Sequence, residues 1–328
     1  MMHNNNVFYA KILLFGEYSV IFNSMGLTIP YTHFTGHLSM PSEKKYTNLD
    51  FALRSNQDLQ DYASYLKTLS ASENEYFDMD FERFDRDLNH GLYFESNIPQ
   101  GFGLGSSGAL VVAIYQQYAK NAIPRSRQMD VKDILKLKEI FSKMESFFHG
   151  TSSGLDPLNC YVQFPLLIKD KDDIQVVNIP RNHNENSAIF LINTGKAGKT
   201  EPLVNLFINN SKKPEYKEKI EKDFIPYTNA SIRSLIEGDY NEFFDNLANL
   251  SKYEYNYLNP MIPEAYHDVW NFGNSSNAFH LKLCGSGGGG FLLGFAKNYD
   301  KAREELKRFN IEPITVYQKS ASKILNNG

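Results

Sequence analysis

The residue types with the clearest chemical meaning lie in a glycine-rich stretch, Pro99–Ala109, with the sequence PQGFGLGSSGA. Its alternating glycines allow positive φ angles and let a ligand approach the backbone closely. Two serines then precede an apolar run where a helix is expected to begin, so the free N–H groups of its first turn would point into the loop. Such an arrangement suits a phosphate group. The alternative is a flexible turn before a buried helix.

The stretch differs from two common phosphate-binding motifs. It has no Gly-Lys-Ser/Thr, so it is not a Walker A loop. Ser106 stands where the dinucleotide-binding fingerprint has its third glycine. A second glycine-rich stretch, LKLCGSGGGG at Leu281–Gly290, follows much later. Consecutive glycines between two strands weaken a sheet and are expected where backbone passes close to a ligand or another segment.

Two charged residues near these stretches have unusual positions. Asp156 lies in the Ser/Gly-rich segment 149–157 and directly precedes Pro157, which favours an extended backbone and a projecting carboxylate. Beside a transferred phosphoryl group such an aspartate accepts the hydroxyl proton, whereas in the alternative it forms an ordinary Asx turn. Lys11 interrupts an apolar strand expected over 7–15. It either extends to solvent at a sheet edge or lies beside Asp156 and favours its ionised form.

A third charged residue falls on the apolar side of a helix expected over 130–148. At 100° per residue Glu145 shares that side with buried positions, and a carboxylate there needs a cation or a donor. The spacing leaves two partners open, Lys138 and a Mg²⁺ ion. His149 ends this helix, where its expected role is to interact with the negative end of the helix dipole.

Composition indicates an ordinary globular chain. It has 328 residues, 42% hydrophobic and 22% charged, with a net charge of −4, which suffices for two domains. The dispersed basic residues argue against a nucleic acid or a membrane as partner, so local groups must hold an anionic ligand. Cys160 and Cys284 are expected to be reduced, buried thiols. Because no signal pattern or long apolar run occurs, we expect a soluble, cytoplasmic protein.

Strands and helices are expected to be mixed along the chain. The expected strands cover 7–15, 20–22, 27–38, 91–98, 161–168, 174–179, 188–193, 279–284, 291–295 and 314–317. The expected helices cover 58–69, 106–121, 130–148, 201–210, 214–236, 239–257, 263–272 and 299–309, with 80–89 as a charged, solvated segment. The polar segment 181–186 predicts a boundary between an N-terminal domain, 1–182, and a C-terminal domain, 183–328.

With these motifs in order, the chain resembles the GHMP kinases, the superfamily of galactokinase, homoserine kinase, mevalonate kinase and phosphomevalonate kinase. Lys11–Tyr18 is similar to its motif one, Pro99–Ala109 to motif two and Lys282–Gly290 to motif three. The resemblance implies a two-domain α+β fold. Its N-terminal α/β domain would bind ATP, and a ferredoxin-like C-terminal domain would bring motif three to the same cleft.

Within the superfamily the motifs are most similar to those of mevalonate kinases, and this resemblance implies roles for individual residues. Asp156 would be the catalytic base, Lys11 would stabilise negative charge, and Ser107 and Glu145 would bind Mg²⁺. ATP would contact Pro99, Gly101, Gly103, Leu104, Gly105, Ser106, Ser107, Gly108, Gly287 and Gly288. The substrate would contact Glu17, Tyr18, Thr200 and Gly288.

Departures from the family pattern leave alternatives open. Mevalonate kinases usually have histidine at the position of Tyr18 and arginine at that of Gly198, whereas phosphomevalonate kinases often carry Gly-Glu-Tyr. Phosphomevalonate is therefore the alternative substrate, with Lys196 and Lys199 as candidates to hold its phosphate. A ligand sensor without catalysis on the same fold is the remote alternative. We expect ATP- and Mg²⁺-dependent phosphorylation of the primary hydroxyl of mevalonate by a monomer or homodimer.

Overall fold

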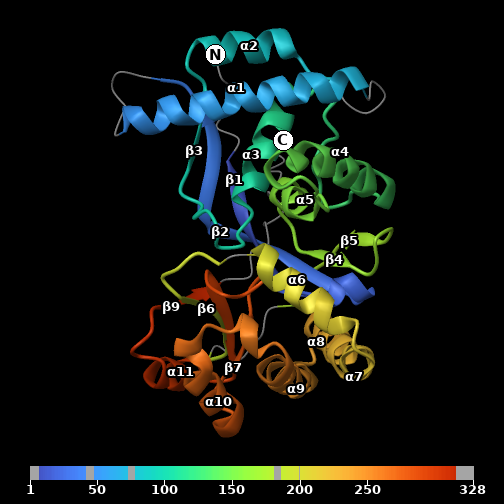
Figure 1. The fold of residues 1–328 in the computed structure, drawn as a ribbon, viewed down its shortest axis with the longest axis vertical. Helices are drawn as coiled ribbons and strands as arrows, with labels where there is room; N and C mark the ends of the chain where they lie inside the picture. Colours follow the sequence, from blue (N-terminus) through green and yellow to red (C-terminus); the bar gives the residue numbers. More distant parts are fainter. Residues whose placement is uncertain (1–6, 42–47, 73–77, 181–185, 199, 315–328) are drawn as a thin grey trace, which may run out of the picture.

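The protein consists of two halves, each built on its own antiparallel sheet. The structure is a computed structural model that describes residues 7–41, 48–72, 78–180, 186–198 and 200–314. The halves are stacked along the long axis of the molecule, with α1 and α2 at one end and α9–α11 at the other (Figure 1). Helices and antiparallel strands are mixed in both halves, which confirms the predicted α+β class.

The N-terminal sheet holds the strand of motif one at its edge. β1 pairs with β2, β2 pairs with β4 and β3, and β4 pairs with β5. Lys11 in β1 uses its outward backbone N–H to donate to the carbonyl of Leu104 at 3.0 Å, so the motif-two loop covers this edge. The strands are β1 (Phe8–Phe15), β2 (Gly26–Ser39), β3 (Tyr93–Ser96), β4 (Leu166–Ile168) and β5 (Ile174–Val176).

Five helices complete the N-terminal half. α3 is buried nearly all round because it packs against β1 and β2 as well as α4 and α5. Gly108 lets α5 approach it closely, since a Cβ there would lie 2.8 Å from the backbone nitrogen of Pro157. The helices are α1 (Leu49–Ser72), α2 (Phe81–Asn89), α3 (Ser106–Tyr118), α4 (Val131–His149) and α5 (Leu155–Val162).

The C-terminal sheet has the predicted ferredoxin-like strand order. Its strands lie in the order β7-β8-β6-β9, so the first strand along the chain lies between the third and the fourth. A helical segment connects the first two strands, and α11 (Tyr299–Glu305) connects the last two. The strands are β6 (Ala188–Asn193), β7 (His280–Leu283), β8 (Phe291–Ala296) and β9 (Ile311–Ile314).

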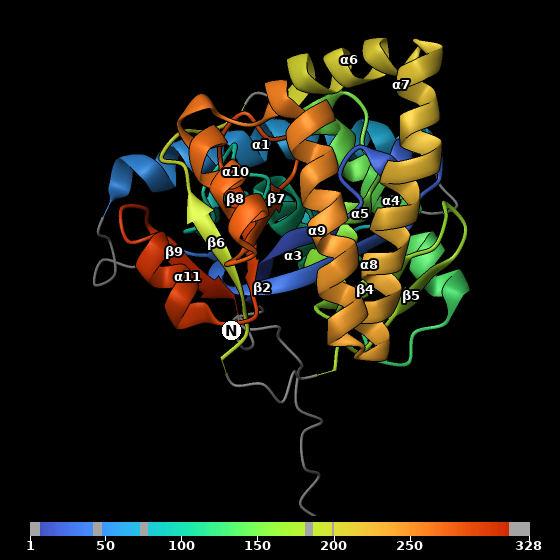
Figure 2. The ribbon, with the colours of Figure 1, turned by 90° about the horizontal axis from the view of Figure 1, so that it is seen from below.

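The helical segment of this half includes a π turn, which lies beside the short segment that follows motif one. In one long helix a π turn, η2 (Ile220–Phe224), precedes Pro226, which has no N–H for a regular helical bond. The π turn contacts η1 (Ser19–Phe22), and α8 and α9 run side by side (Figure 2). The other elements are α6 (Thr200–Ser211), α7 (Pro214–Lys219), α8 (Ile225–Glu237), α9 (Tyr240–Tyr257), η3 (Asn259–Met261), η4 (Glu264–Tyr266) and α10 (His267–Ser276).

Several sequence-based expectations need correction. Residues 20–22 form a 3₁₀ turn, and 161–162 end α5, so neither segment is extended. The charged segment 80–89 contains the helix α2, because the Asp80 side chain caps its first turn and one face is buried. The expected boundary at 181–186 lies almost wholly outside the described residues, so the division at 182/183 stays a prediction.

The expectation for the two cysteines is confirmed. Cys160 and Cys284 are buried, free thiols. In the ranges that the structure describes, no helix is both long and apolar enough to cross a membrane. The last expected strand, 314–317, lies mostly outside these ranges, and β9 ends at Ile314.

Candidate active site

The N-terminus of α3 forms the floor of the site. Gly101, Gly103 and Gly105 have φ angles of 78°, 72° and 76°, which confirms the positive φ predicted for this loop. Gly105 is the N-cap and has no side chain to cap the helix. The N–H groups of residues 106–108 therefore have no intrahelical acceptor, and with the helix dipole they favour an anion. This geometry fits the phosphate loop expected from the sequence.

Lys11 and Asp156 form an ion pair beside this helix terminus. The Lys11 Nζ lies 2.8 Å from the Asp156 Oδ1, with side-chain exposures of 7% and 43%. Burial alone would lower the pKa of Lys11, but the nearby Asp156 carboxylate raises it above its usual value. The lysine stays protonated and its counter-ion stays open to solvent. The predicted pairing is confirmed, and the alternative of a lysine extending to solvent is wrong.

Asp156 reaches this position from a helix, which corrects the expected extended backbone. Gly154 is the N-cap of α5, so Asp156 lies in the first helical turn. Pro157 follows within the same turn, where a missing N–H breaks no helical bond.

Glu145 is buried in α4 and meets hydroxyl groups. Its side chain is on the apolar face, as predicted, and the residue is 4% exposed. Oε1 accepts a hydrogen bond from Ser107 at 2.9 Å and Oε2 one from Ser152 at 2.5 Å. Lys138 instead donates to the carbonyl of Lys171 at 2.9 Å. Of the two partners that the spacing left open, Lys138 is therefore wrong.

The surroundings of Glu145 fit a Mg²⁺ ion. Burial raises the pKa of Glu145 and Asp156 adds to this, whereas hydrogen bonds from Ser152 and Ser107 and the nearby His149 lower it. No group of three or more potential ligands from His, Cys, Asp and Glu occurs in the described ranges. Mg²⁺ commonly uses one or two protein carboxylates and completes its shell with phosphate oxygens and water, so this oxygen donor set suits it.

The sequence analysis did not assign two polar residues to the site. His149, expected only to interact with the helix dipole, places its Nε2 3.1 Å from the Ser107 hydroxyl. Ser152 binds the far side of the Glu145 carboxylate. The spacing of four residues between Glu145 and His149 places both on one helix face and could have identified the histidine. Nothing in the spacing identified Ser152.

The motif-three loop, Gly285–Gly290, meets the motif-two loop through the segment 194–198. The N–H of Gly290 donates to the Lys196 carbonyl at 2.6 Å, and the N–H of Gly198 donates to the Gly101 carbonyl at 3.1 Å. A Cβ on Gly198 would lie 2.7 Å from the Gly287 carbonyl oxygen. The close contact explains why no arginine occupies this position.

Glu17 and Tyr18 of motif one make contacts with the motif-three loop. The Glu17 Oε2 lies 2.7 Å from the Lys282 Nζ, and Oε1 accepts the N–H of Gly285 at 3.4 Å. The Tyr18 hydroxyl donates to the Ser286 carbonyl at 2.5 Å. Glu17 and Tyr18 are 5% and 6% exposed. Their expected role as substrate ligands stays a prediction, and their contacts lead to the other half of the molecule.

Glu254 of α9 completes a buried charged cluster around Lys282. Its Oε2 accepts the N–H of Leu283 at 2.7 Å. Burial raises the pKa of Glu254 to about 8, Lys282 opposes this shift and Glu17 adds to it. The Lys282 ammonium cannot neutralise the buried carboxylates of both Glu17 and Glu254. Glu254 therefore retains its proton near neutral pH.

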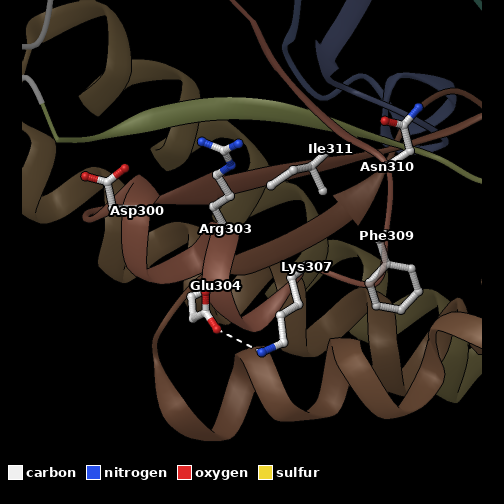
Figure 3. Close-up of a pocket in the computed structure, with 7 residues that line it drawn as sticks. All are labelled: Asp300, Arg303, Glu304, Lys307, Phe309, Asn310 and Ile311. Carbon is white, nitrogen blue, oxygen red and sulfur yellow. Dashed lines mark hydrogen bonds and ion pairs between the residues drawn. The ribbon is translucent and has the colours of Figure 1, made fainter.

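An open hollow on the C-terminal half lies at α11 and β9 (Figure 3). Its lining mixes charges of both signs, including an ion pair of 2.9 Å between Glu304 and Lys307. None of the motif residues contributes to it. The lining residues are Asp300, Arg303, Glu304, Lys307, Phe309, Asn310 and Ile311.

Comparisons with known proteins show the family to which this chain belongs. Residues 67–163 match the family model of the GHMP kinases N terminal domain, and residues 231–313 match that of the GHMP kinases C terminal domain. The two models together cover more than half of the chain. The chain belongs to the GHMP kinase family, and it is therefore an ATP-dependent kinase that acts on an alcohol.

Individual relatives point to one branch of the family. The chain is 25% identical to the mevalonate kinase of Pyrococcus abyssi over 316 residues, covering 88% of this chain and 87% of that protein. The same identity and coverage hold for the mevalonate kinase of Thermococcus sibiricus over 317 residues. L. major mevalonate kinase in complex with R-mevalonate has a similar fold, with a TM-score of 0.64, 16% identity and 98% coverage of both chains.

The buried cluster predicts a pH-dependent stability. The pKa of Glu254 is 4.5 when unshifted and about 8 in the fold, so the unfolded chain releases this proton at a lower pH than the folded protein, and the stability that the protonated carboxyl contributes is lost as pH rises between these values. The free energy of unfolding of Glu254→Gln, relative to that of the wild type, should therefore increase from about pH 5 to about pH 8. Denaturant titrations measure this, with the exposed Glu215→Gln as the control. Parallel pH profiles of wild type and Glu254→Gln would contradict the assignment.

Proposed function

We propose that this kinase transfers the γ-phosphoryl group of ATP to the primary hydroxyl of mevalonate. Its sequence relatives named mevalonate kinase match it over most of its length. The observation that carries the proposal is the Lys11–Asp156 ion pair beside the uncapped N-terminus of α3. An ionised, accessible carboxylate next to a phosphate-binding helix terminus suits phosphoryl transfer to a hydroxyl group.

Each of these groups has a distinct role in the proposed reaction. The N–H groups of residues 106–108 bind the ATP phosphates. Asp156 accepts the hydroxyl proton as the oxygen forms its bond to the γ-phosphorus, and the bond to the bridging oxygen breaks and releases ADP. Lys11 pairs with the Asp156 carboxylate and offsets negative charge on the phosphoryl oxygens. Little else is needed, because phosphoryl transfer depends mainly on positioning and electrostatics.

Ser107 and Glu145 are the residues that would hold Mg²⁺. Such an ion, when bound, neutralises charge on the ATP phosphates. Ser152 fixes the outer oxygen of the Glu145 carboxylate, and His149 contacts the Ser107 hydroxyl. These two contacts would orient the ligands toward the phosphate loop.

The residues around motif three favour mevalonate over phosphomevalonate. The added phosphate carries a charge of about −1.5 to −2 near neutral pH and needs paired cations if it is buried. The Tyr18 hydroxyl, a possible phosphate donor, is already bonded to the Ser286 carbonyl. Lys196 is exposed at the motif-three loop and is the one cation in the described segment 194–198. The side chains of Lys199 and Thr200 lie outside the described residues, so their roles stay predictions.

A substrate panel tests the proposal. Steady-state kinetics with mevalonate, phosphomevalonate, galactose and homoserine should give mevalonate a kcat/KM at least about a hundredfold above the others. That ratio corresponds to roughly 3 kcal/mol of differential transition-state binding. A preference for phosphomevalonate would assign the chain to that reaction instead, and turnover of none of the four would refute the proposal.

The metal assignment predicts a selective defect in Glu145→Gln. Losing a charged oxygen ligand should raise the Mg²⁺ concentration for half-maximal activity by about tenfold or more. The metal-free variant should be as stable as the wild type or more so, because an unneutralised buried carboxylate is unfavourable. Glu139→Gln on the same helix, where Glu139 pairs with Lys143 at 3.0 Å, is the matched control. An unchanged Mg²⁺ dependence combined with a markedly lower melting temperature would indicate a purely structural role.

A further inference from the structure

The turn after β1 contacts the C-terminal half of the molecule through a buried ion pair between Glu17 and Lys282. The Glu17 and Lys282 side chains are 2% and 1% exposed, and the two residues are 265 positions apart in the chain. The same ammonium donates to the Leu283 carbonyl at 2.6 Å. An ion pair removed from water to this degree tolerates little change in its geometry, because each charge depends on the other for compensation.

These contacts end at the beginning of the motif-three loop. The Glu17 Oε1 accepts the N–H of Gly285 at 3.4 Å, and the Tyr18 hydroxyl donates to the Ser286 carbonyl at 2.5 Å. The middle of the loop is bonded within the C-terminal half, where the N–H of Gly288 donates to the Met261 carbonyl at 2.6 Å. Motif one thus determines where the first part of the loop lies.

The backbone of Tyr18 supports a dedicated role. Its φ is 62°, a left-handed conformation that is uncommon for a bulky residue and costs energy. In this conformation the ring packs against Phe207, with 4.7 Å between ring centroids, and the hydroxyl reaches Ser286. The strained turn is maintained by contacts to α6 and the motif-three loop, both in the C-terminal half.

The same strand carries the charge at the reacting centre. Lys11 lies in the middle of β1 and pairs with Asp156, and Glu17 follows the end of β1 by two residues. Because β1 pairs with β2 from Phe8 to Phe15, the strand holds Lys11 in a defined place relative to the turn that carries Glu17. The ion pair at the reacting centre and the contacts to the motif-three loop therefore both start from β1 and the turn that follows it.

We propose that Glu17 and Tyr18 are positioning residues that hold the motif-three loop against the bound nucleotide, with Lys282 as the partner in the C-terminal half. Neither side chain contacts the substrate in this account. The inference depends on the chain binding ATP and does not depend on mevalonate being the acceptor. It predicts that a change at these residues weakens nucleotide binding and leaves acceptor binding nearly unaltered.

Nucleotide titration of four variants tests the proposal: Tyr18→Phe, Glu17→Gln, Lys282→Met and the double variant Glu17→Gln/Lys282→Met. Loss of the contacts that place the loop should move its backbone away from the bound nucleotide and weaken the hydrogen bonds between them. The Kd of a fluorescent ATP analogue should therefore rise roughly tenfold or more in Glu17→Gln, and less in Tyr18→Phe. The KM for mevalonate should change by less than about twofold, because only interactions with the acceptor alter its binding.

Matched measurements guard against a general loss of structure. Replacing Lys282 alone leaves the buried Glu17 carboxylate without a cation, so the double variant should melt at a higher temperature than Lys282→Met. The surface pair Glu304→Gln/Lys307→Met is the control and should leave the nucleotide Kd unchanged. A higher KM for mevalonate with an unaltered nucleotide Kd would make Glu17 a substrate ligand and overturn the proposal. So would equal nucleotide Kd values in the folded Tyr18→Phe and Glu17→Gln variants and the wild type.

The test separates this inference from the proposed function. The titration requires no acceptor, so a wild type that does not phosphorylate mevalonate refutes the substrate assignment alone. A wild type that phosphorylates mevalonate, combined with unchanged nucleotide binding in the folded variants, refutes the positioning role alone.

Discussion

The buried ammonium of Lys11 is the charge on which the arrangement of the site depends. An ammonium with a side chain only 7% exposed requires a negative partner, and Asp156 provides it at 2.8 Å. This pair holds the start of α5 against β1. The backbone N–H of Lys11 binds Leu104, so the motif-two loop is held against the same strand. One residue of a rigid strand therefore brings the phosphate-binding helix terminus and the accessible carboxylate together.

The two halves contribute different parts to the nucleotide site. The N-terminal half provides the uncapped helix terminus, the Lys11–Asp156 pair and the Glu145 carboxylate. The C-terminal half adds the motif-three loop, whose glycines pass within contact distance of the motif-two loop. Such close passage of two backbones leaves no room for side chains, which is why glycine recurs in both loops. The ion pair between Glu17 and Lys282 joins the halves where they meet.

The sequence predicts local features of this site well and its long-range contacts poorly. The phosphate loop and the helix carrying Glu145 follow from residue types and periodicity, whereas the ferredoxin-like strand order follows only from the family resemblance. The partner of Glu145 does not, because helix spacing favours Lys138 equally, and only the folded chain shows Lys138 bonded to Lys171. Likewise, no spacing rule relates Glu17 to Lys282, since their contact depends on how two sheets meet.

We propose that Asp156 is the base of an ATP-dependent transfer to a hydroxyl group. Single-turnover kinetics of Asp156→Asn at saturating ATP and mevalonate test it most directly. The account predicts a rate lower by about two orders of magnitude or more, the usual contribution of a positioned base. The variant should melt at a lower temperature, because the buried Lys11 ammonium loses its counter-ion, but it should still fold, because Asn keeps the side-chain size and its amide oxygen can accept from Lys11. Nucleotide affinity should be preserved, because the terminus of α3 is untouched. A near-normal rate in this variant would contradict the account.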